Sequence, residues 1–200
     1  MAVKKHAPAT LRNREAILSV LRDELPRSGT VLEIAAGSGE HAVFFAGALP
    51  QLGWLPTDPS HEALASIAAY REEAGLPNLQ APTLLNAALG NWPIKKAAAI
   101  VCINMVHISP WAATAGLMKG AAQILSGKDA PLILYGPYFE HGVEPAPSNL
   151  DFDLSLRSRN PAWGIRNAER LDSLAKQHGM ARSARHEMPA NNLTLVYRKA

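Results

Sequence analysis

Apolar side chains recur along the chain in two spacings, one typical of helices and one typical of buried strands. Residues 10–25 place apolar positions three and four apart, with charges between them, and end before Pro26, which predicts an amphipathic helix. Short apolar runs at residues 30–35, 97–104 and 131–135 are typical of strands that are buried on both faces. Because helical spacing returns between these runs, strands and helices are expected to alternate along the chain.

The remaining segments complete one architecture. The same criteria predict helices at residues 41–49, 60–74, 111–125 and 168–178, a strand at residues 53–57, and a weaker strand at residues 79–85, where Pro82 cannot donate a ladder hydrogen bond. Two further strands, residues 181–187 and 193–198, are separated by a short turn and therefore predict a hairpin. We predict an α/β fold with a doubly wound, Rossmann-like sheet of seven strands, mostly parallel, with an antiparallel C-terminal edge hairpin and an N-terminal helix.

Composition places this fold in one packed unit. The 200 residues are 48% hydrophobic and 18% charged, which is enough apolar material for a sizeable core and too little charge for a disordered protein. We expect a single domain over residues 1–200, in which residues 1–27 form a helical extension and the long connection at residues 139–161 is a candidate lid. No apolar run approaches the roughly 20 residues that span a bilayer, so a cytoplasmic protein without membrane attachment is expected. The single cysteine, Cys102, excludes an internal disulfide bond.

Charge is unevenly distributed along the chain. Residues 28–150 carry nine acidic and five basic side chains between two basic ends, while the whole chain has a net charge of +3. Lysine and arginine do not cluster with interleaved aromatic residues, so nucleic acid binding is not expected, and the acidic middle suits a cationic ligand slightly better. The histidines show no spacing typical of metal ligands, so no metal is predicted.

The most informative stretch is a glycine-containing turn, VLEIAAGSGEHA at residues 31–42. Gly37 and Gly39 allow positive φ angles and close approach of a ligand, and the following helix presents its N–H groups. Asp58 lies 19 residues after Gly39, at the end of the second predicted strand, where an acid accepts hydrogen bonds from a ribose diol. This spacing fits both a dinucleotide and S-adenosylmethionine. Glu33 would oppose a pyrophosphate but suits a cofactor with sulfonium and ammonium groups. In the structural alternative, the glycines only form a tight turn and Asp58 caps a helix.

This stretch resembles motif I of class I S-adenosylmethionine-dependent methyltransferases. From about residue 12 to residue 198, the whole chain resembles one branch of that superfamily, the DUF938 or methyltransferase-like 26 family. The segments that carry the resemblance are RNR at residues 12–14, NMVHISPW at 104–111, YGPY at 135–138, SN at 148–149, FD at 152–153, LR at 156–157, WGIR at 163–166 and MPANN at 188–192.

The resemblance implies S-adenosylmethionine as cofactor and assigns its contacts position by position. It implies that the methionine moiety faces Glu33, Ala35, Gly37 and Gly39, that Asp58 holds the ribose, that Asn86 lies beside the adenine, and that Asn104 and Met105 border the methyl group. Relatives usually place an aspartate where this chain has Asn86, whose amide oxygen accepts without charge assistance. His41 either packs on the cofactor or caps the following helix.

Candidate residues for chemistry follow the fourth and fifth predicted strands. His107 is a candidate base and Tyr138 its catalytic companion, because both follow strands at the sheet edge where ligands bind; otherwise they are structural. The expected substrate pocket combines aromatic and polar side chains beneath the candidate lid: Trp111, Tyr135, Asn149, Asp153, Arg157 and Trp163. Each of these residues has a structural alternative in the core or in an exposed connection.

The expected function is methyl transfer from S-adenosylmethionine to a small-molecule acceptor. A module that binds the cofactor or a partner without catalysis is one alternative. An NAD(P)-dependent oxidoreductase is another, which the helix before the first strand and the absence of a Tyr-x-x-x-Lys pair disfavour. The sequence predicts neither the acceptor atom nor the oligomeric state.

Overall fold

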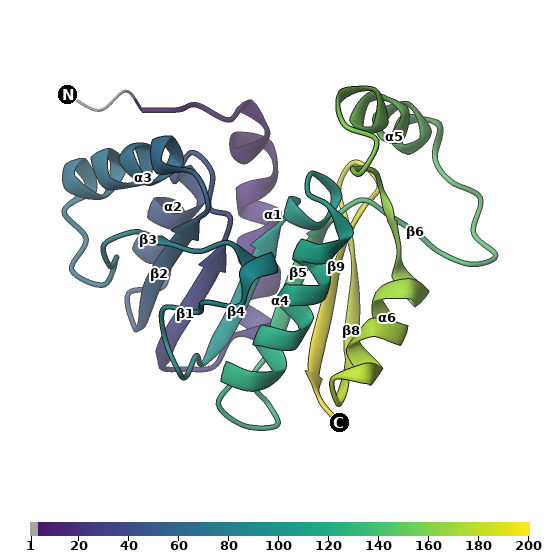
Figure 1. Ribbon diagram of the computed structural model, residues 1–200. Helices are drawn as coiled ribbons and strands as arrows, with labels where there is room; N and C mark the ends of the chain where they lie inside the picture. Colours follow the sequence, from purple (N-terminus) through teal and green to yellow (C-terminus); the bar gives the residue numbers. More distant parts are fainter. Residues whose placement is uncertain (1–3) are drawn as a thin grey trace.

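A seven-stranded sheet forms the centre of the computed structural model, which describes residues 4–200 (Figure 1). Its strand order is β3-β2-β1-β4-β5-β9-β8. The strands are β1 (Gly29–Ile34), β2 (Leu52–Asp58), β3 (Thr83–Leu84), β4 (Ala99–Ile103), β5 (Leu132–Gly136), β8 (Met180–Met188) and β9 (Asn192–Lys199). Strands β1 to β5 run parallel, while β9 pairs antiparallel with both β5 and β8. The predicted Rossmann-like sheet with an antiparallel edge hairpin is therefore confirmed. Residues 1–3, the start of the expected helical extension, lie outside the described residues.

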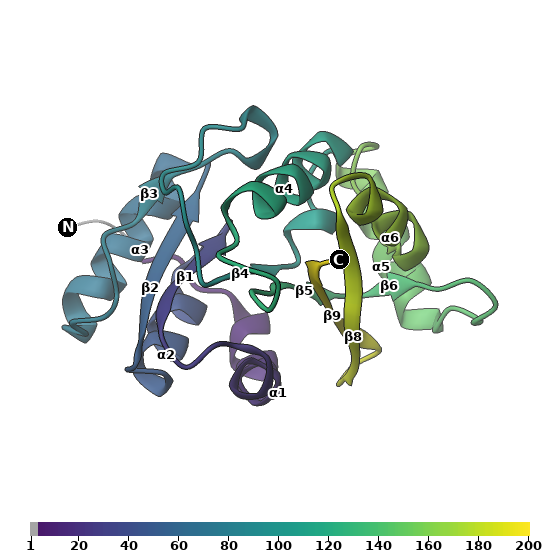
Figure 2. The ribbon, with the colours of Figure 1, turned by 90° about the horizontal axis from the view of Figure 1, so that it is seen from below.

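Helices cover both faces of the sheet. They are α1 (Pro8–Glu24), α2 (Glu40–Ala48), α3 (His61–Ala74), α4 (Trp111–Ile124), α5 (Pro147–Arg159) and α6 (Ala168–Gln177). Figure 2 shows α1 and α2 on one side of the sheet and α4 and α6 on the other. Two 3-10 helices, η1 (Ala87–Leu89) and η2 (Met105–His107), follow β3 and β4.

Alternation within the central strands explains their continuous apolar character. Val31 of β1 packs in the core beneath α1 and α2, whereas Leu32 and Ile34 pack in the core beneath α4 and α6. Since successive side chains of a strand point to opposite faces, a strand covered on both sides needs apolar residues at every position. Ile17 and Leu21 join the first of these cores, so α1 is an integral part of the packed domain.

Strand β3 is shorter than predicted. The expected strand at residues 79–85 is reduced to Thr83–Leu84, and Leu79 makes only an isolated bridge to Trp54. Pro82 lies between these two pairings and has no N–H to donate, which accounts for the interruption.

The connection at residues 139–161 contains a helix that the sequence pattern does not indicate. Helix α5 buries only Asn149 and Leu156, while Leu150 and Leu154 are exposed, so it lacks the apolar stripe on which helix prediction depends. Two short strands, β6 (Tyr138–Phe139) and β7 (Arg166–Asn167), pair in parallel on either side of it and close the connection into a loop. Helix α5 lies beyond the tip of the β8–β9 hairpin (Figure 1).

Within residues 4–200, no helix combines the length and the apolar character that crossing a membrane requires.

Candidate functional site

The loop between β1 and α2 has the backbone that its glycines suggest. Ala35, Gly37 and Gly39 all have positive φ, at 55°, 60° and 93°. A Cβ atom at Gly39 would lie 2.8 Å from the Cα atom of Ile67 on α3, so only glycine fits there. At Gly37 the nearest atom to an added Cβ is the carbonyl oxygen of Ala35, 4.0 Å away, so this side of the loop is open.

Asp58 fixes the open side of the glycine loop. One carboxylate oxygen accepts a hydrogen bond from the Gly37 N–H at 3.0 Å, and the other accepts from the Ser60 N–H at 2.9 Å. The N-cap of α3 is Ser60, whose hydroxyl accepts from the Ala63 N–H, so Asp58 is not the cap of that helix. A carboxylate has about four acceptor positions, so Asp58 keeps two for a ligand.

Glu33 is a buried carboxyl group at the end of β1. Its side chain is 2% exposed and accepts a hydrogen bond from the indole N–H of Trp54 at 2.7 Å. Burial raises the pKa of Glu33 to about 7, the Trp54 hydrogen bond opposes that rise, and the negative charge of Asp58 adds to it. A positively charged ligand near Glu33 would favour the ionised form.

A cavity of about 420 Å³ opens at the carboxyl ends of β1 to β4. We call it the strand-end cavity. Ala35, Pro59, Asn86 and Met105 line it from four successive strand ends, and Trp163 lines it from the loop after α5. Doubly wound sheets bind ligands outside these strand ends. Ala35, Asn86 and Met105, all predicted cofactor contacts, therefore lie together here, and Trp163 joins them although the sequence assigned it to the substrate pocket.

Asn86 also caps a short helix at the wall of the strand-end cavity. As the N-cap of η1, its side-chain oxygen accepts a hydrogen bond from the Ala88 N–H at 3.0 Å. One acceptor position is therefore occupied, and one remains for a ligand.

A second cavity, of about 510 Å³, lies between α1, α5 and the hairpin turn. We call it the helix–hairpin cavity. Its wall is formed by Ala9, Arg12, Asn13, Asn104, Tyr135, Pro137, Ser148, Asn149, Phe152, Pro189, Ala190 and Asn192. Of the predicted site residues, Asn104, Tyr135 and Asn149 are here. Asn104 lines this cavity and the next residue, Met105, lines the strand-end cavity, so both cavities border the end of β4.

Helix α1 contributes residues that were not among the predicted site residues. Arg12 and Asn13 were noted only within the segment that carries the family resemblance, and no local pattern indicates that α1 returns to the sheet edge. Helix α2 contacts the start of α1 through Glu40. The Glu40 carboxylate accepts a hydrogen bond from the Ala7 N–H at 2.7 Å and pairs with His6 at 2.7 Å. These contacts hold the start of α1 against the start of α2.

His41 lies between α1 and α2. Its Nε2 atom is 2.8 Å from the side-chain oxygen of Asn13, and its ring stacks on Phe45. Burial, opposed by the charge of Glu40 and aided by that of Arg14, lowers the pKa of His41 to about 4, so the ring is neutral at physiological pH. The N-cap position of α2 belongs to Gly39, so His41 does not cap that helix.

His107 and Tyr138 are packed together beneath the sheet edge. Their rings meet edge to face at a centroid distance of 4.8 Å, and both side chains are buried. Burial and the nearby Arg166 charge lower the pKa of His107 to about 3, and burial raises the pKa of Tyr138 well above its usual range. Neither residue lines either of the two cavities. Their catalytic roles stay predictions, which this geometry does not favour.

Trp111, Asp153 and Arg157 brace the loop that carries Trp163. Asp153 accepts from Arg157 Nε at 2.6 Å and from the Ile165 N–H at 2.7 Å. Trp111 stacks beneath two arginines, the closer being Arg170 at 4.1 Å from the ring centroid. None of the three lines the cavities, so in this structure they act on the site through the loop.

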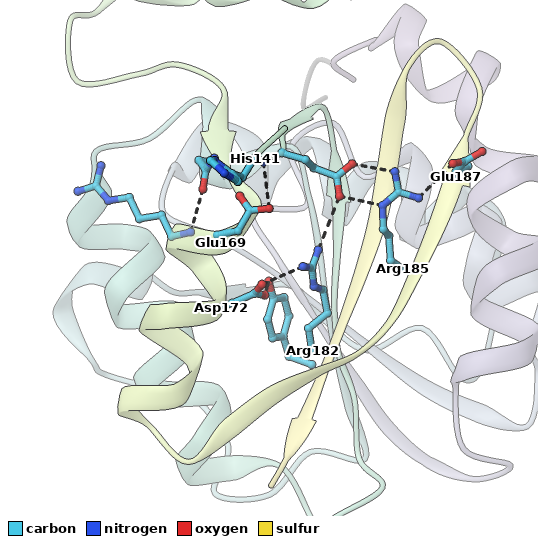
Figure 3. A network of polar contacts seen from close by, with 10 residues as sticks. His141, Glu169, Asp172, Arg182, Arg185 and Glu187 are labelled. Carbon is cyan, nitrogen blue, oxygen red and sulfur yellow. Dashed lines mark hydrogen bonds and ion pairs between the residues drawn. The ribbon is translucent and has the colours of Figure 1, made fainter. Parts of the chain in front are cut away.

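A polar network ties the segment after β6 to the hairpin and to α6 (Figure 3). Arg185 of β8 donates two hydrogen bonds to Glu140, at 2.7 and 2.8 Å, and Arg182 pairs with Asp172 of α6 at 2.9 Å. The Arg185 guanidinium lowers the pKa of Glu140. The network borders a smaller cavity of about 280 Å³, in which acidic side chains outnumber basic ones.

Among residues 4–200, no group of three or more histidine, cysteine, aspartate or glutamate side chains could hold a metal ion.

Comparison with known proteins identifies the family. Residues 4–199 match the family described as "Protein of unknown function (DUF938)". Over 80 residues, the chain is 35% identical to a tRNA (guanine-N(7)-)-methyltransferase of Rhodopseudomonas palustris, a match that covers 40% of this chain and 31% of that protein.

Solved structures share the fold at low identity. The mitomycin 7-O-methyltransferase superposes with a TM-score of 0.79 at 15% identity, over 96% of this chain and 54% of that one. A methyltransferase of calicheamicin biosynthesis, in its S-adenosylhomocysteine-bound form, superposes with a TM-score of 0.72 at 15% identity, over 96% and 55%. The chain thus spans about a third to a half of the length of these proteins. Because the match at residues 4–199 covers nearly the whole chain, the protein belongs to the DUF938 family.

Proposed function

We propose that this protein transfers the methyl group of S-adenosylmethionine to a small-molecule acceptor. The observation that carries the proposal is that two cavities border the end of β4, one lined by Asn104 and the other by the next residue, Met105. One cavity adjoins the glycine loop and the other is walled by α1, α5 and the hairpin. A group-transfer enzyme needs such a pair of adjoining compartments, one for the donor and one for the acceptor.

Groups next to the strand-end cavity fit the cofactor: Glu33 and Asp58 directly adjoin its lining residues Ile34 and Pro59 in the chain, although neither they nor Gly37 line it themselves. The open backbone at Gly37 allows close approach, Asp58 keeps acceptor positions for a ribose diol, and buried Glu33 suits a cation. In relatives with the same fold, one structure holds S-adenosylhomocysteine, which supports the same ligand class here.

Transfer of a methyl group depends mainly on placement. The bound cofactor supplies an electrophilic methyl group on a sulfonium, and an acceptor atom must approach it in line, in a site that excludes water. We assign the orienting role to Asn104 and Met105, which separate the two cavities, and the covering role to the 139–161 segment. Helix α5 supplies Ser148, Asn149 and Phe152 to one cavity, and its C-cap Asn160 lies in the wall of the other.

Calorimetric titration with S-adenosylhomocysteine and with NAD tests the cofactor. We expect micromolar binding of the adenosyl compound and no heat with NAD. Asp58→Ala should weaken binding by about 1.5 to 3 kcal/mol, as expected for lost hydrogen bonds to a charged group. Asp23→Ala, an exposed carboxylate on α1, is the matched control. Heat with NAD alone would overturn the proposal, and an unchanged dissociation constant for Asp58→Ala would remove that residue from the site.

Turnover separates an enzyme from a binding module. Formation of S-adenosylhomocysteine should depend on an added acceptor, so small-molecule pools and tRNA are offered separately. Binding of the adenosyl compound with no product from any pool would favour the non-catalytic alternative. If S-adenosylhomocysteine forms only when tRNA is added, the acceptor is tRNA and not a small molecule.

A further inference from the structure

We infer that the helix–hairpin cavity accepts a small molecule that carries a carboxylate, and that Arg12 of α1 selects it. This inference rests on the proposed methyl transfer, because it names the class of acceptor at that same site. Three features of the cavity carry it: its charge, the engagement of its polar groups and its apolar surface.

The charge of the wall is the first feature. Among the residues that line the cavity, Arg12 is the one charged side chain, and no aspartate or glutamate is present. Arg12 is exposed, and none of the hydrogen bonds or ion pairs found within residues 4–200 involves its guanidinium. Its five N–H donors are therefore free, and their fork geometry matches a carboxylate.

Two residues further along α1, Arg14 shows the contrasting case. Its guanidinium lies over the Phe44 ring, 4.5 Å from the centroid, and it does not line the cavity. The two arginines are therefore not equivalent, and Arg12 is the one that faces a ligand space.

The second feature is that the asparagine side chains of the wall already form hydrogen bonds within the protein. Asn149 donates its side-chain N–H to the Asn191 carbonyl at 3.0 Å, and Asn192 donates to the Pro189 carbonyl at 2.9 Å. The Asn13 oxygen is taken by His41 at 2.8 Å. The first of these bonds ties α5 to the hairpin turn, the second closes the turn itself, and the third ties α1 to α2. With these amide groups engaged in the fold, Arg12 is left as the charged donor for an anion.

Tyr135 adds a second donor to the same wall. Burial raises the pKa of its hydroxyl, and a hydrogen bond from Asn13 opposes that rise, so the phenol keeps its proton at neutral pH. A protonated hydroxyl can donate to a ligand oxygen.

The apolar part of the wall is the third feature. Phe152 is 37% exposed on α5, and Pro137 and Pro189 also belong to the lining. An apolar surface with a few convergent polar groups is typical of a small-molecule site. An acceptor with a flat apolar body and one carboxylate satisfies both parts of this wall.

The position of the acidic side chains supports the same conclusion. The acidic middle of the sequence suggested a cationic ligand, but Glu140 and Glu144 line the smaller cavity beyond α5, together with Glu187. Nucleic acid fits the helix–hairpin cavity poorly, because phosphate backbones are held by several basic side chains and this wall offers one.

Matched pairs of acids and amides test the inference. The probes are 4-hydroxybenzoate with 4-hydroxybenzamide and 3-phenylpropionate with 3-phenylpropionamide, titrated into the protein saturated with S-adenosylhomocysteine. We expect at least one acid to bind tenfold or more tightly than its amide. Arg12→Gln should abolish that preference and Arg12→Lys should retain part of it. Arg22→Gln, an exposed arginine on the same helix and outside the cavity, should leave it unchanged.

Each other outcome overturns the inference in a distinct way. Equal affinity for acids and amides would show that the cavity does not recognise a carboxylate. A preference for acids that survives Arg12→Gln would show that Arg12 does not select it. Tighter binding of phenyl phosphate than of any carboxylic acid would show that the cavity recognises a phosphate group and not a carboxylate. If tRNA binds and none of the acids displaces it, the ligand of this cavity is a nucleic acid and not a small molecule. Failure of the wild-type protein to bind S-adenosylhomocysteine refutes the proposed function itself, whereas intact cofactor binding without acid preference refutes only this inference.

Discussion

Replacing Glu33 by glutamine should make the protein more stable at high pH and leave it nearly unchanged at low pH. The carboxyl group is 2% exposed and its pKa is raised to about 7 from the usual 4.5. The folded protein therefore holds a proton that the unfolded chain releases between these two values, so stability is lost as the pH rises through 7. Glutamine keeps an oxygen for the Trp54 indole and cannot ionise.

The magnitude follows from the pKa difference. At about 1.4 kcal/mol per pH unit, the stability difference between Glu33→Gln and wild type should grow in favour of the variant by about 2 to 3 kcal/mol between pH 5 and pH 8. Urea denaturation of both proteins at each pH measures this difference, in which the titration of other groups cancels. Glu15→Gln, an exposed glutamate on α1, is the control and should show no such change. A stability difference that is independent of pH would refute the argument.

The same group links protonation to ligand binding. A cationic ligand beside Glu33 lowers its pKa, so binding should release a proton near neutral pH. Titration with S-adenosylmethionine, whose sulfonium and ammonium groups are both positively charged, in two buffers of different ionisation enthalpy measures that release, which Glu33→Gln should abolish. Identical proton release in the variant would show that the ligand does not lie near Glu33.

Further predictions concern the adenine end and the lid. Asn86→Asp should tighten binding of S-adenosylhomocysteine modestly, by about twofold to tenfold, because a charged acceptor makes the stronger hydrogen bond; weaker binding by a folded variant would place the adenine elsewhere. Hydrogen exchange in residues 139–161 should slow when S-adenosylhomocysteine and an acceptor are both bound, and equal exchange rates would make the segment an ordinary connection. Because His107 is buried and lines neither cavity, His107→Ala should leave turnover per folded molecule unchanged, and lower turnover with unchanged cofactor affinity would instead support the predicted catalytic role.

The sheet was predictable because its strands are covered on both sides. Continuous apolar runs predicted β1, β4 and β5 within a few residues, since each buries side chains in both cores. Helix α5 was missed because two buried residues in thirteen give no apolar period. Its packing partners lie in the hairpin, more than thirty residues away along the chain.

The part of the candidate site that depends on backbone conformation was predictable from the sequence. The glycine loop and Asp58 occupy fixed places in a strand–loop–helix unit, so their spacing indicates a ligand. Trp163 and Arg12 reach the cavities through contacts between distant segments, such as Arg166 donating to the Val106 carbonyl at 2.8 Å and Glu40 receiving the Ala7 N–H. No local pattern encodes these contacts, which is why the sequence did not group Trp163 with Ala35, Asn86 and Met105 and assigned Arg12 to no site.

The place of β9 in the sheet sets an order of assembly during synthesis. Strand β9 follows the other six strands of the sheet in the sequence, yet it sits between β5 and β8. Until it emerges, the apolar strand β5 remains an open edge to which another chain can pair. The glycine loop and strands β1 to β4 precede it by more than eighty residues, so a nascent chain can form most of the strand-end cavity before the hairpin turn completes the helix–hairpin cavity. Slow or failed insertion of β9 should therefore yield aggregates that still bind an adenosyl ligand.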